Sequence, residues 1–182
     1  MSKPDHFSLD VKKLRADARE KITQGAITHN YRADSNAIIA LLDTALATEL
    51  VCTLRYKANY YKAETLGARV AANEFLEHST QEQQHADLIA KRIVQLGGQP
   101  NLCPDTLSKR SHVEYICSDT LAGMIKENLI AERIAIDSYR EIITYIGSTD
   151  PTTRRVLEEI LATEEEHADD LVDLLAEYNI TL

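Results

Sequence analysis

Apolar residues recur at spacings of three and four along four long segments of this chain, which is the pattern of amphipathic α-helices. Gly67, Gly97 and Gly147 interrupt the pattern between segments. Ser35, or Asp34 before it, and Asp150 stand at segment starts, where either residue type is a good N-cap. The sequence therefore predicts helices over residues 35–65, 68–96, 113–146 and 151–175.

Each predicted helix has one apolar stripe. The stripe positions are Ile38, Leu42, Ala45, Leu46, Leu50 and Tyr56; then Phe75, Ser79, Ala86, Ile89, Ile93 and Leu96; then Leu121, Ile125, Leu129, Ile136, Tyr139, Ile143 and Ile146; and finally Val156, Ile160, Ala168, Leu171 and Leu175. Because such a helix is stable only when its apolar side is covered, the four stripes predict one shared core.

The connections between the helices predict how the chain is threaded. The turn at Gly67 is short, so the first two helices should be antiparallel neighbours. The irregular segment 97–111 contains Pro100 and Pro104 and is longer than a tight turn. About fifteen extended residues span the roughly 45 Å of a thirty-residue helix. We therefore predict an all-α four-helix bundle over residues 35–182, with one long crossover between the second and third helices.

Residues 1–34 form an N-terminal extension of mixed charge, in which a short amphipathic helix is expected. Its apolar positions are Leu9, Val11, Leu14, Ala18 and Ile22, its cations Lys12, Lys13, Arg15, Arg19 and Lys21, and its acids Asp10, Asp17 and Glu20. Two interpretations remain: a solvated or packing helix, and an arm that binds nucleic acid. The interleaved acids favour the first.

Composition narrows the class of protein. The 182 residues include no Trp, six Gly and four Pro, which suits a helical domain large enough to bury a core. The formal charge of −9 argues against a general polyanion binder and suits a protein that handles cations. Three cysteines without Cys-x-x-Cys spacing make no disulfide framework, so the cytoplasm is the expected compartment. No signal peptide or membrane-spanning apolar run is expected, and hence no membrane partner.

A glutamate interrupts the apolar stripe near the middle of every predicted helix. These residues are Glu49, Glu82, Glu132 and Glu164. The second and fourth belong to Glu-x-x-His motifs that continue with the same Ala-Asp pair, and they bring in His85 and His167. The first and third are each followed seven residues later by a tyrosine. The chain therefore consists of two related helical hairpins.

This arrangement has a direct chemical interpretation. A Glu and a His three residues apart project from one helix face within reach of a single cation. Four carboxylates in a core of low dielectric constant would repel one another or take up protons unless cations neutralised them. Oxygen donors with two imidazoles suit iron or manganese. The alternative, that each Glu is an ordinary solvated residue, requires the same coincidence in four helices.

One Glu from each of two helices and Glu-x-x-His from each of two others is the pattern of ferritin-like di-iron carboxylate proteins. Within that group, residues 41–175 resemble the bacterioferritins. The matching positions are Glu49-Leu50-Val51, Tyr56, Glu82, His85-Ala86-Asp87, Gly98-Gln99-Pro100-Asn101, Glu132, Arg140-Glu141, Glu164-Glu165 and His167. The resemblance implies a ferritin-like bundle with two iron ions per subunit, which Mn or Zn can replace. Glu49 and His85 would be terminal ligands of one ion, Glu132 and His167 of the other, and Glu82 and Glu164 the bridges.

The chain departs from the bacterioferritins in three places. Gln83 stands where the family has the Met that binds haem, so no haem is expected. Few residues follow Leu175, too few for the family's fifth helix. The extension and the long crossover resemble Dps-like cages, some of which combine such a metal site with a cysteine pair. Cys103 and Cys117 are candidates for that pair, which their spacing alone does not establish.

The resemblance implies a ferroxidase and iron-storage protein that oxidises Fe(II) with O2 or H2O2 inside a hollow homo-oligomer, with a dodecamer favoured over a 24-mer. Two alternatives remain: a di-metal redox enzyme that stores nothing, such as a peroxidase, Mn catalase or oxygenase, and a DNA-protecting Dps-type cage. Tyr56 and Tyr139 are either neighbours of the ligands or ordinary core tyrosines. His78 is either an accessory ligand or, as we favour, a partly exposed histidine. Glu158, Glu159 and Asp173 line pores or are simply solvated.

Overall fold

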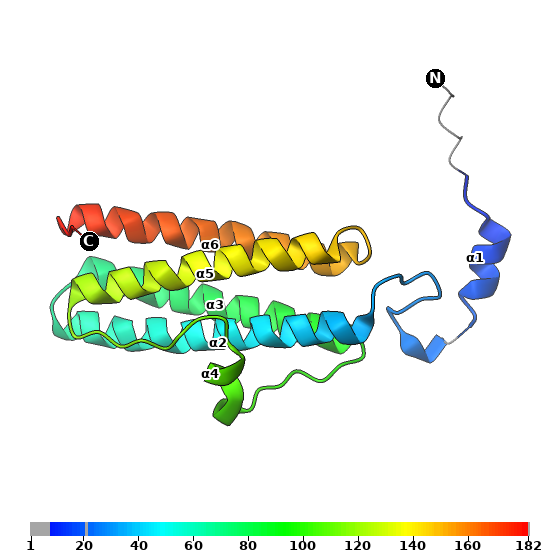
Figure 1. Ribbon diagram of the computed structural model, residues 1–182, viewed down its shortest axis with the longest axis horizontal. Helices are drawn as coiled ribbons and strands as arrows, with labels where there is room; N and C mark the ends of the chain where they lie inside the picture. Colours follow the sequence, from blue (N-terminus) through cyan, green and yellow to red (C-terminus); the bar gives the residue numbers. More distant parts are fainter. Residues whose placement is uncertain (1–7, 21, 182) are drawn as a thin grey trace, which may run out of the picture.

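Four long helices run side by side in the computed structural model, which describes residues 8–20 and 22–181 (Figure 1). They are α2 (Ser35–Thr65), α3 (Arg69–Gln95), α5 (Leu121–Ile146) and α6 (Pro151–Glu177). Helices α2 and α3 form one antiparallel hairpin, and α5 and α6 form another. No strand occurs in the described residues. The fold is the predicted ferritin-like bundle.

The crossover between α3 and α5 carries the chain from one end of the bundle to the other (Figure 1). It contains a 3-10 turn, Pro104–Thr106, and a short helix α4, Leu107–Arg110. Arg110 ties this part to α2, since its guanidinium donates to the backbone carbonyl of Asp43 at 2.8 Å and to the Asp43 carboxylate at 3.0 Å. The crossover is thus held against the bundle by specific polar contacts.

The prediction that the third helix begins near Val113 is wrong, because α5 begins at Leu121. Residues 113–120 instead continue the crossover along α2. Val113 is buried in the core, and Arg55 donates to the backbone carbonyl of Glu114 at 3.1 Å. Thr120 then caps α5 by accepting from the backbone N–H of Gly123. These tertiary contacts hold the segment extended despite its helical sequence pattern.

The apolar core is divided into two clusters, one in each half of the bundle. One surrounds Tyr56, Phe75 and Ile125, and the other surrounds Leu46 and Ile89. The predicted stripes of α2, α3 and α5 are mostly buried, whereas on α6 the stripe is partly misplaced. Val156, Ala168 and Leu175 are only half-buried there, and Leu157 and Leu174 are buried instead. The glutamates lie between the two clusters, at the middle of the bundle.

The N-terminal extension stands away from the bundle (Figure 1). Its helix α1 covers only Val11–Asp17 and contains no residue that is buried within this chain. Among its cations, Lys13 is paired with Asp17 at 2.6 Å, and Lys21 lies outside the described residues. The extension contacts the bundle near its end, where the hydroxyl of Tyr31 donates to Asp150 at 2.7 Å.

Helix α2 is, by length and composition alone, long and apolar enough to cross a membrane. The expectation that no segment reaches that length is therefore wrong. The buried residues of α2 include Glu49 and Arg55, and the helix packs against α3 and α5. Its hydrophobicity is accounted for by its place in the bundle core.

Candidate metal centre

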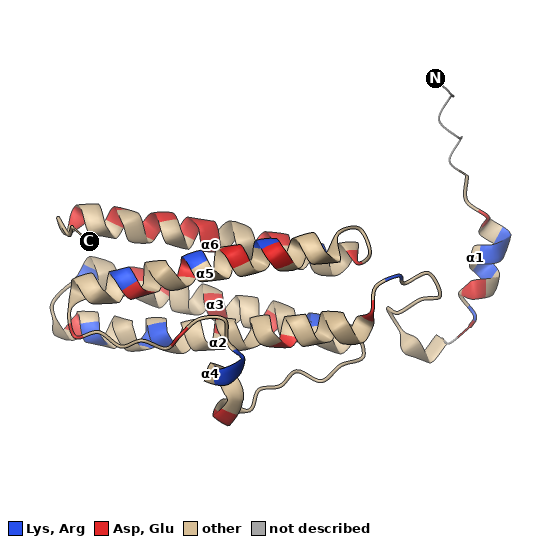
Figure 2. Ribbon diagram, in the orientation of Figure 1, with Lys and Arg blue, Asp and Glu red and all other residues tan. Residues whose placement is uncertain are grey.

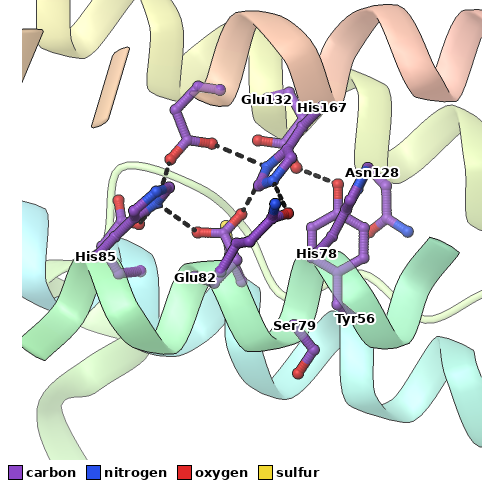
Figure 3. A network of polar contacts seen from close by, with 12 residues as sticks. Tyr56, His78, Ser79, Glu82, His85, Asn128, Glu132 and His167 are labelled. Carbon is purple, nitrogen blue, oxygen red and sulfur yellow. Dashed lines mark hydrogen bonds and ion pairs between the residues drawn. The ribbon is translucent and has the colours of Figure 1, made fainter. Parts of the chain in front are cut away.

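The structure brings all six candidate ligands together at the middle of the bundle. Figure 3 labels Glu82, His85, Glu132 and His167 among them. Their ligand atoms form two overlapping sets, and within each set the atoms lie within 4.8 Å of one another. The sets are Glu49, Glu82, His85 and Glu164, and Glu82, Glu132, Glu164 and His167. Glu82 and Glu164 belong to both. This is the division into terminal and bridging residues that the resemblance implies, although their binding of metal stays a prediction.

Each histidine turns its Nδ1 atom toward the carboxylates. The Nδ1 atom of His85 lies 3.1 Å from Glu49 and 3.0 Å from Glu164. The Nδ1 atom of His167 lies 3.5 Å from both Glu82 and Glu164. Each imidazole is therefore within reach of a cation that its neighbouring carboxylates would hold.

Gln81 fixes the orientation of His167. Its amide oxygen lies 2.8 Å from the Nε2 atom of His167 and can only accept, so Nε2 carries the hydrogen and donates it. The lone pair of His167 then lies on Nδ1, which faces the carboxylates. A partner that fixes the ring in this way is usual for metal-binding histidines. Gln81 was not among the residues predicted for the site, although its position directly before Glu82 was a signal.

Two tyrosines connect the hairpins at the centre. Tyr56 on α2 donates to Glu132 on α5, and Tyr139 on α5 donates to Glu49 on α2. Both tyrosines are buried. The sequence left open whether they are core residues or neighbours of the ligands, and the structure shows that they are both.

A second buried polar pair lies beside the centre and was not anticipated. The Nε atom of Arg55 donates to the side-chain oxygen of Asn128 at 2.8 Å. Arg55 precedes Tyr56, and Asn128 lies one helical turn before Glu132, so the pair joins α2 and α5 close to the ligands. Arg55 and Asn128 are polar residues at core-facing positions, and this was the sequence signal that could have identified the pair.

Several carboxylate oxygens in the centre have no hydrogen-bond partner. They include Glu82 Oε1, Glu132 Oε2 and Glu164 Oε2, and all three side chains are essentially inaccessible to solvent. Buried oxygens without donors are costly, and a divalent cation is what would satisfy several at once. The residues present therefore fit a pair of hard cations.

Burial also determines the pKa values of the groups in the centre. Burial, together with the charge of neighbouring carboxylates, raises the pKa values of Glu82, Glu132 and Glu164. Burial acts against ionisation of Glu49 as well, but the hydrogen bond and charge of His85 outweigh it and lower the Glu49 pKa. Burial opposes protonation of His85, whereas hydrogen bonds to Glu164 and Glu49 raise its pKa to about 10. Protons thus occupy the cluster until cations displace them.

The structure corrects the interpretation of His78. We favoured a partly exposed histidine, but His78 is 1% exposed. Its ring stacks on that of His167, with the ring centroids 4.0 Å apart (Figure 3).

The three cysteines are all free; Cys52 is buried, and Cys103 and Cys117 are exposed.

Comparison with known proteins places this arrangement in context. Residues 39–180 match the model of the ferritin-like domain family. The bacterioferritin of Rhodobacter capsulatus is 30% identical over 144 residues, which cover 78% of this chain and 84% of the relative. The bacterioferritin of Brucella melitensis is 32% identical over 145 residues, which cover 76% and 84%.

A solved structure is also similar. It is the dodecameric thioferritin of Bacteroides fragilis, a bacterioferritin-related protein, with 32% sequence identity and a TM-score of 0.77. The similarity covers 81% of this chain and 89% of that one.

Proposed function

This chain belongs to the ferritin-like family, and on that premise we propose that it is a ferroxidase that stores the iron it oxidises. Fe(II) is the substrate, O2 or H2O2 is the oxidant, and the ferric product collects inside a hollow homo-oligomer. The observation that supports this most directly is the pair of overlapping ligand sets sharing Glu82 and Glu164. Two ions that share two carboxylates lie close enough to react with one oxidant molecule.

The reaction balances at this centre without another reductant. Two Fe(II) ions lose one electron each, and O2 takes up both electrons with two protons and leaves as H2O2. When H2O2 is the oxidant, it takes up two electrons and two protons and leaves as two water molecules. The ions supply the electrons, and the protein supplies their positions.

The residues of the centre divide this task. Glu49 and His85 hold one Fe(II), Glu132 and His167 hold the other, and Glu82 and Glu164 hold both. The two tyrosines fix the outer carboxylates by donating to one oxygen of each. Because burial excludes water, the charges of the carboxylates act on the ions with little screening.

Assembly into a hollow shell is part of the proposal. The similarity to a dodecameric relative over most of both chains supports twelve subunits rather than twenty-four. No haem is included, because Gln83 stands where bacterioferritins have Met, and Gln83 is exposed on α3. The proposal includes a cytoplasmic location. It leaves out DNA protection, because Lys13 on α1 is paired with Asp17.

The test is oxidation followed by retention. Metal-free protein is loaded anaerobically with Fe(II), exposed to O2 and followed by the absorbance of Fe(III). We expect a rapid phase that consumes two Fe(II) per chain, and then retention of many more ions per assembly after gel filtration. Rapid oxidation without retention would instead support the di-metal enzyme, and absence of the rapid phase would contradict the ferroxidase assignment.

A further inference from the structure

Another cluster of potential ligands lies where α3 and α6 meet, and the proposed reaction does not use it. It consists of Glu74 and His78 on α3 and Asp170 on α6, with ligand atoms within 4.8 Å of one another. The Nε2 atom of His78 lies 3.1 Å from Glu74 Oε1 and 3.4 Å from Asp170 Oδ2. One imidazole nitrogen thus faces two carboxylates from two helices.

Hydrogen bonding alone satisfies this arrangement poorly. A single N–H on Nε2 can point well at only one of the two oxygens, and the other carboxylate is then left facing its like-charged neighbour. A divalent ion about 2.1 Å from each donor atom would set those atoms about 3.0 Å apart in octahedral geometry and about 3.4 Å apart in tetrahedral geometry. The two separations from His78 Nε2, 3.1 Å and 3.4 Å, fall in this range.

His78 is held rigidly in place for this role. Its ring is 1% exposed, stacks on His167, and meets the ring of Tyr56 edge-on with centroids 5.1 Å apart (Figure 3). Its Nδ1 atom has no hydrogen-bond partner. Rotation of the ring would break the stacking on His167 and the edge-on contact with Tyr56, so Nε2 stays aimed at Glu74 and Asp170.

The two carboxylates give the cluster access to solvent. The side chain of Glu74 is 28% exposed and that of Asp170 is 49% exposed. Figure 2 shows acidic residues along much of α6, and a surface of that sign raises the local concentration of cations. An ion can therefore arrive from water and keep water molecules as its remaining ligands.

We propose that Glu74, His78 and Asp170 bind a third metal ion, a divalent cation of the first transition series, beside the di-metal centre. The binding of a cation here does not depend on the proposed function. This site shares no ligand with the centre, although the rings of His78 and His167 stack on each other.

The test counts Zn²⁺ bound per chain in the metal-free assembled protein by equilibrium dialysis and metal analysis. The variant is Glu74→Gln with Asp170→Asn, both on partly exposed side chains whose loss should not unfold the bundle. The matched control is Glu77→Gln with Asp173→Asn, which removes the same charge from exposed positions of the same two helices. We expect three Zn²⁺ for the wild type and the control, and two for the variant. Anomalous diffraction at the zinc edge should place the third ion on His78 Nε2.

Equal Zn²⁺ counts in the variant and the wild type, or an equal loss in the control, would overturn the third site. The variant Glu82→Ala with Glu164→Ala separates this result from the proposed function. If the third site is real, further exchange of Glu74→Gln and Asp170→Asn in this variant removes one Zn²⁺ per chain, whatever the four remaining ligands of the centre still bind. If the third site exists but the di-metal centre does not, the wild type binds a single Zn²⁺. Only the variant Glu74→Gln with Asp170→Asn then loses it, and Glu82→Ala with Glu164→Ala keeps it.

Discussion

Single residues at the centre act across the two hairpins rather than within them. Tyr56 holds Glu132, and Tyr139 holds Glu49, so each hairpin orients a carboxylate of the other. The bond from Tyr56 leaves the second oxygen of Glu132 without a partner. Such fixed carboxylates with a free oxygen can receive an ion with little rearrangement.

Replacement of a shared carboxylate gives the sharpest prediction at this scale. Glu82→Ala removes a ligand from both overlapping sets, so we expect loss of the rapid phase of Fe(II) oxidation in a bundle that still folds. The metal-free variant should be no less stable than metal-free wild type, because the substitution removes a buried carboxyl group whose Oε1 atom has no hydrogen-bond partner. Stopped-flow absorbance and urea unfolding measure the two effects.

The control for this substitution is Gln83→Ala, at the next position of α3, where the side chain is exposed. It should oxidise Fe(II) at the wild-type rate. A Glu82→Ala variant as fast as this control would contradict the assignment of the centre.

At the scale of the elements, the start of α6 is held by a buried polar group. Asp150 accepts from the backbone N–H of Thr153 as the N-cap of α6 and lies 2.9 Å from Arg92 on α3. The hydroxyl of Tyr31 donates to it as well. Asp150 is 1% exposed and Arg92 is 6% exposed, so little solvent screens the pair. One residue thus joins the extension, α3 and α6.

Asp150→Asn should lower the free energy of unfolding by about 3 kcal/mol, because it removes the carboxylate that neutralises the buried Arg92 charge. Asn is as good an N-cap as Asp, so the decrease in the free energy of unfolding measures the lost charge pairing with Arg92 and not a lost N-cap. The matched control is Asp34→Asn at the exposed N-cap of α2, for which we expect a change within about 0.5 kcal/mol. Urea unfolding of the metal-free proteins measures both. Equal losses in the two variants would show that the buried pair adds nothing.

The same residue predicts a pH dependence. Burial acts to raise the pKa of Asp150, but hydrogen bonds from Thr153, Tyr31 and Arg92 outweigh it and lower the pKa below the ordinary value of 3.8. A carboxyl group whose pKa is lower in the folded than in the unfolded protein contributes its full stabilisation to the folded state above the unfolded pKa. This contribution is lost as the pH falls through the folded pKa. The stability difference between wild type and Asp150→Asn should therefore be constant above about pH 5 and shrink below about pH 4. A difference that grows in acid would contradict this assignment.

The whole molecule is predicted to be a dodecamer. A closed shell repeats the same contacts between subunits around symmetry axes. Twelve chains of 20.4 kDa give roughly 245 kDa, which light scattering with size-exclusion chromatography can measure. About twice that mass would indicate the larger shell, and a stable dimer would contradict storage while leaving di-metal chemistry possible.

Local sequence pattern determined much of this molecule. A helix repeats every 3.6 residues, so the apolar stripes predicted the helices α2, α3 and α6. The N-cap residues and the glycines placed their ends within about two residues of those in the structure. The same periodicity placed Glu49, Glu82, Glu132 and Glu164 on the buried faces at mid-helix, where the structure has them. The spacing of Glu-x-x-His did the same for His85 and His167, because residues three apart on a helix share a face.

Only the tertiary structure decided which side chains meet across helices. The start of α5 at Leu121 depends on contacts that residues 113–120 make with α2, and no local pattern contains them. The sequence favoured a partly exposed His78, yet it is buried because α6 covers it and places His167 against its ring. The approach of Asp170 to His78 has the same cause. Periodicity sets the direction of a side chain from its own helix, whereas its partners depend on how the helices pack.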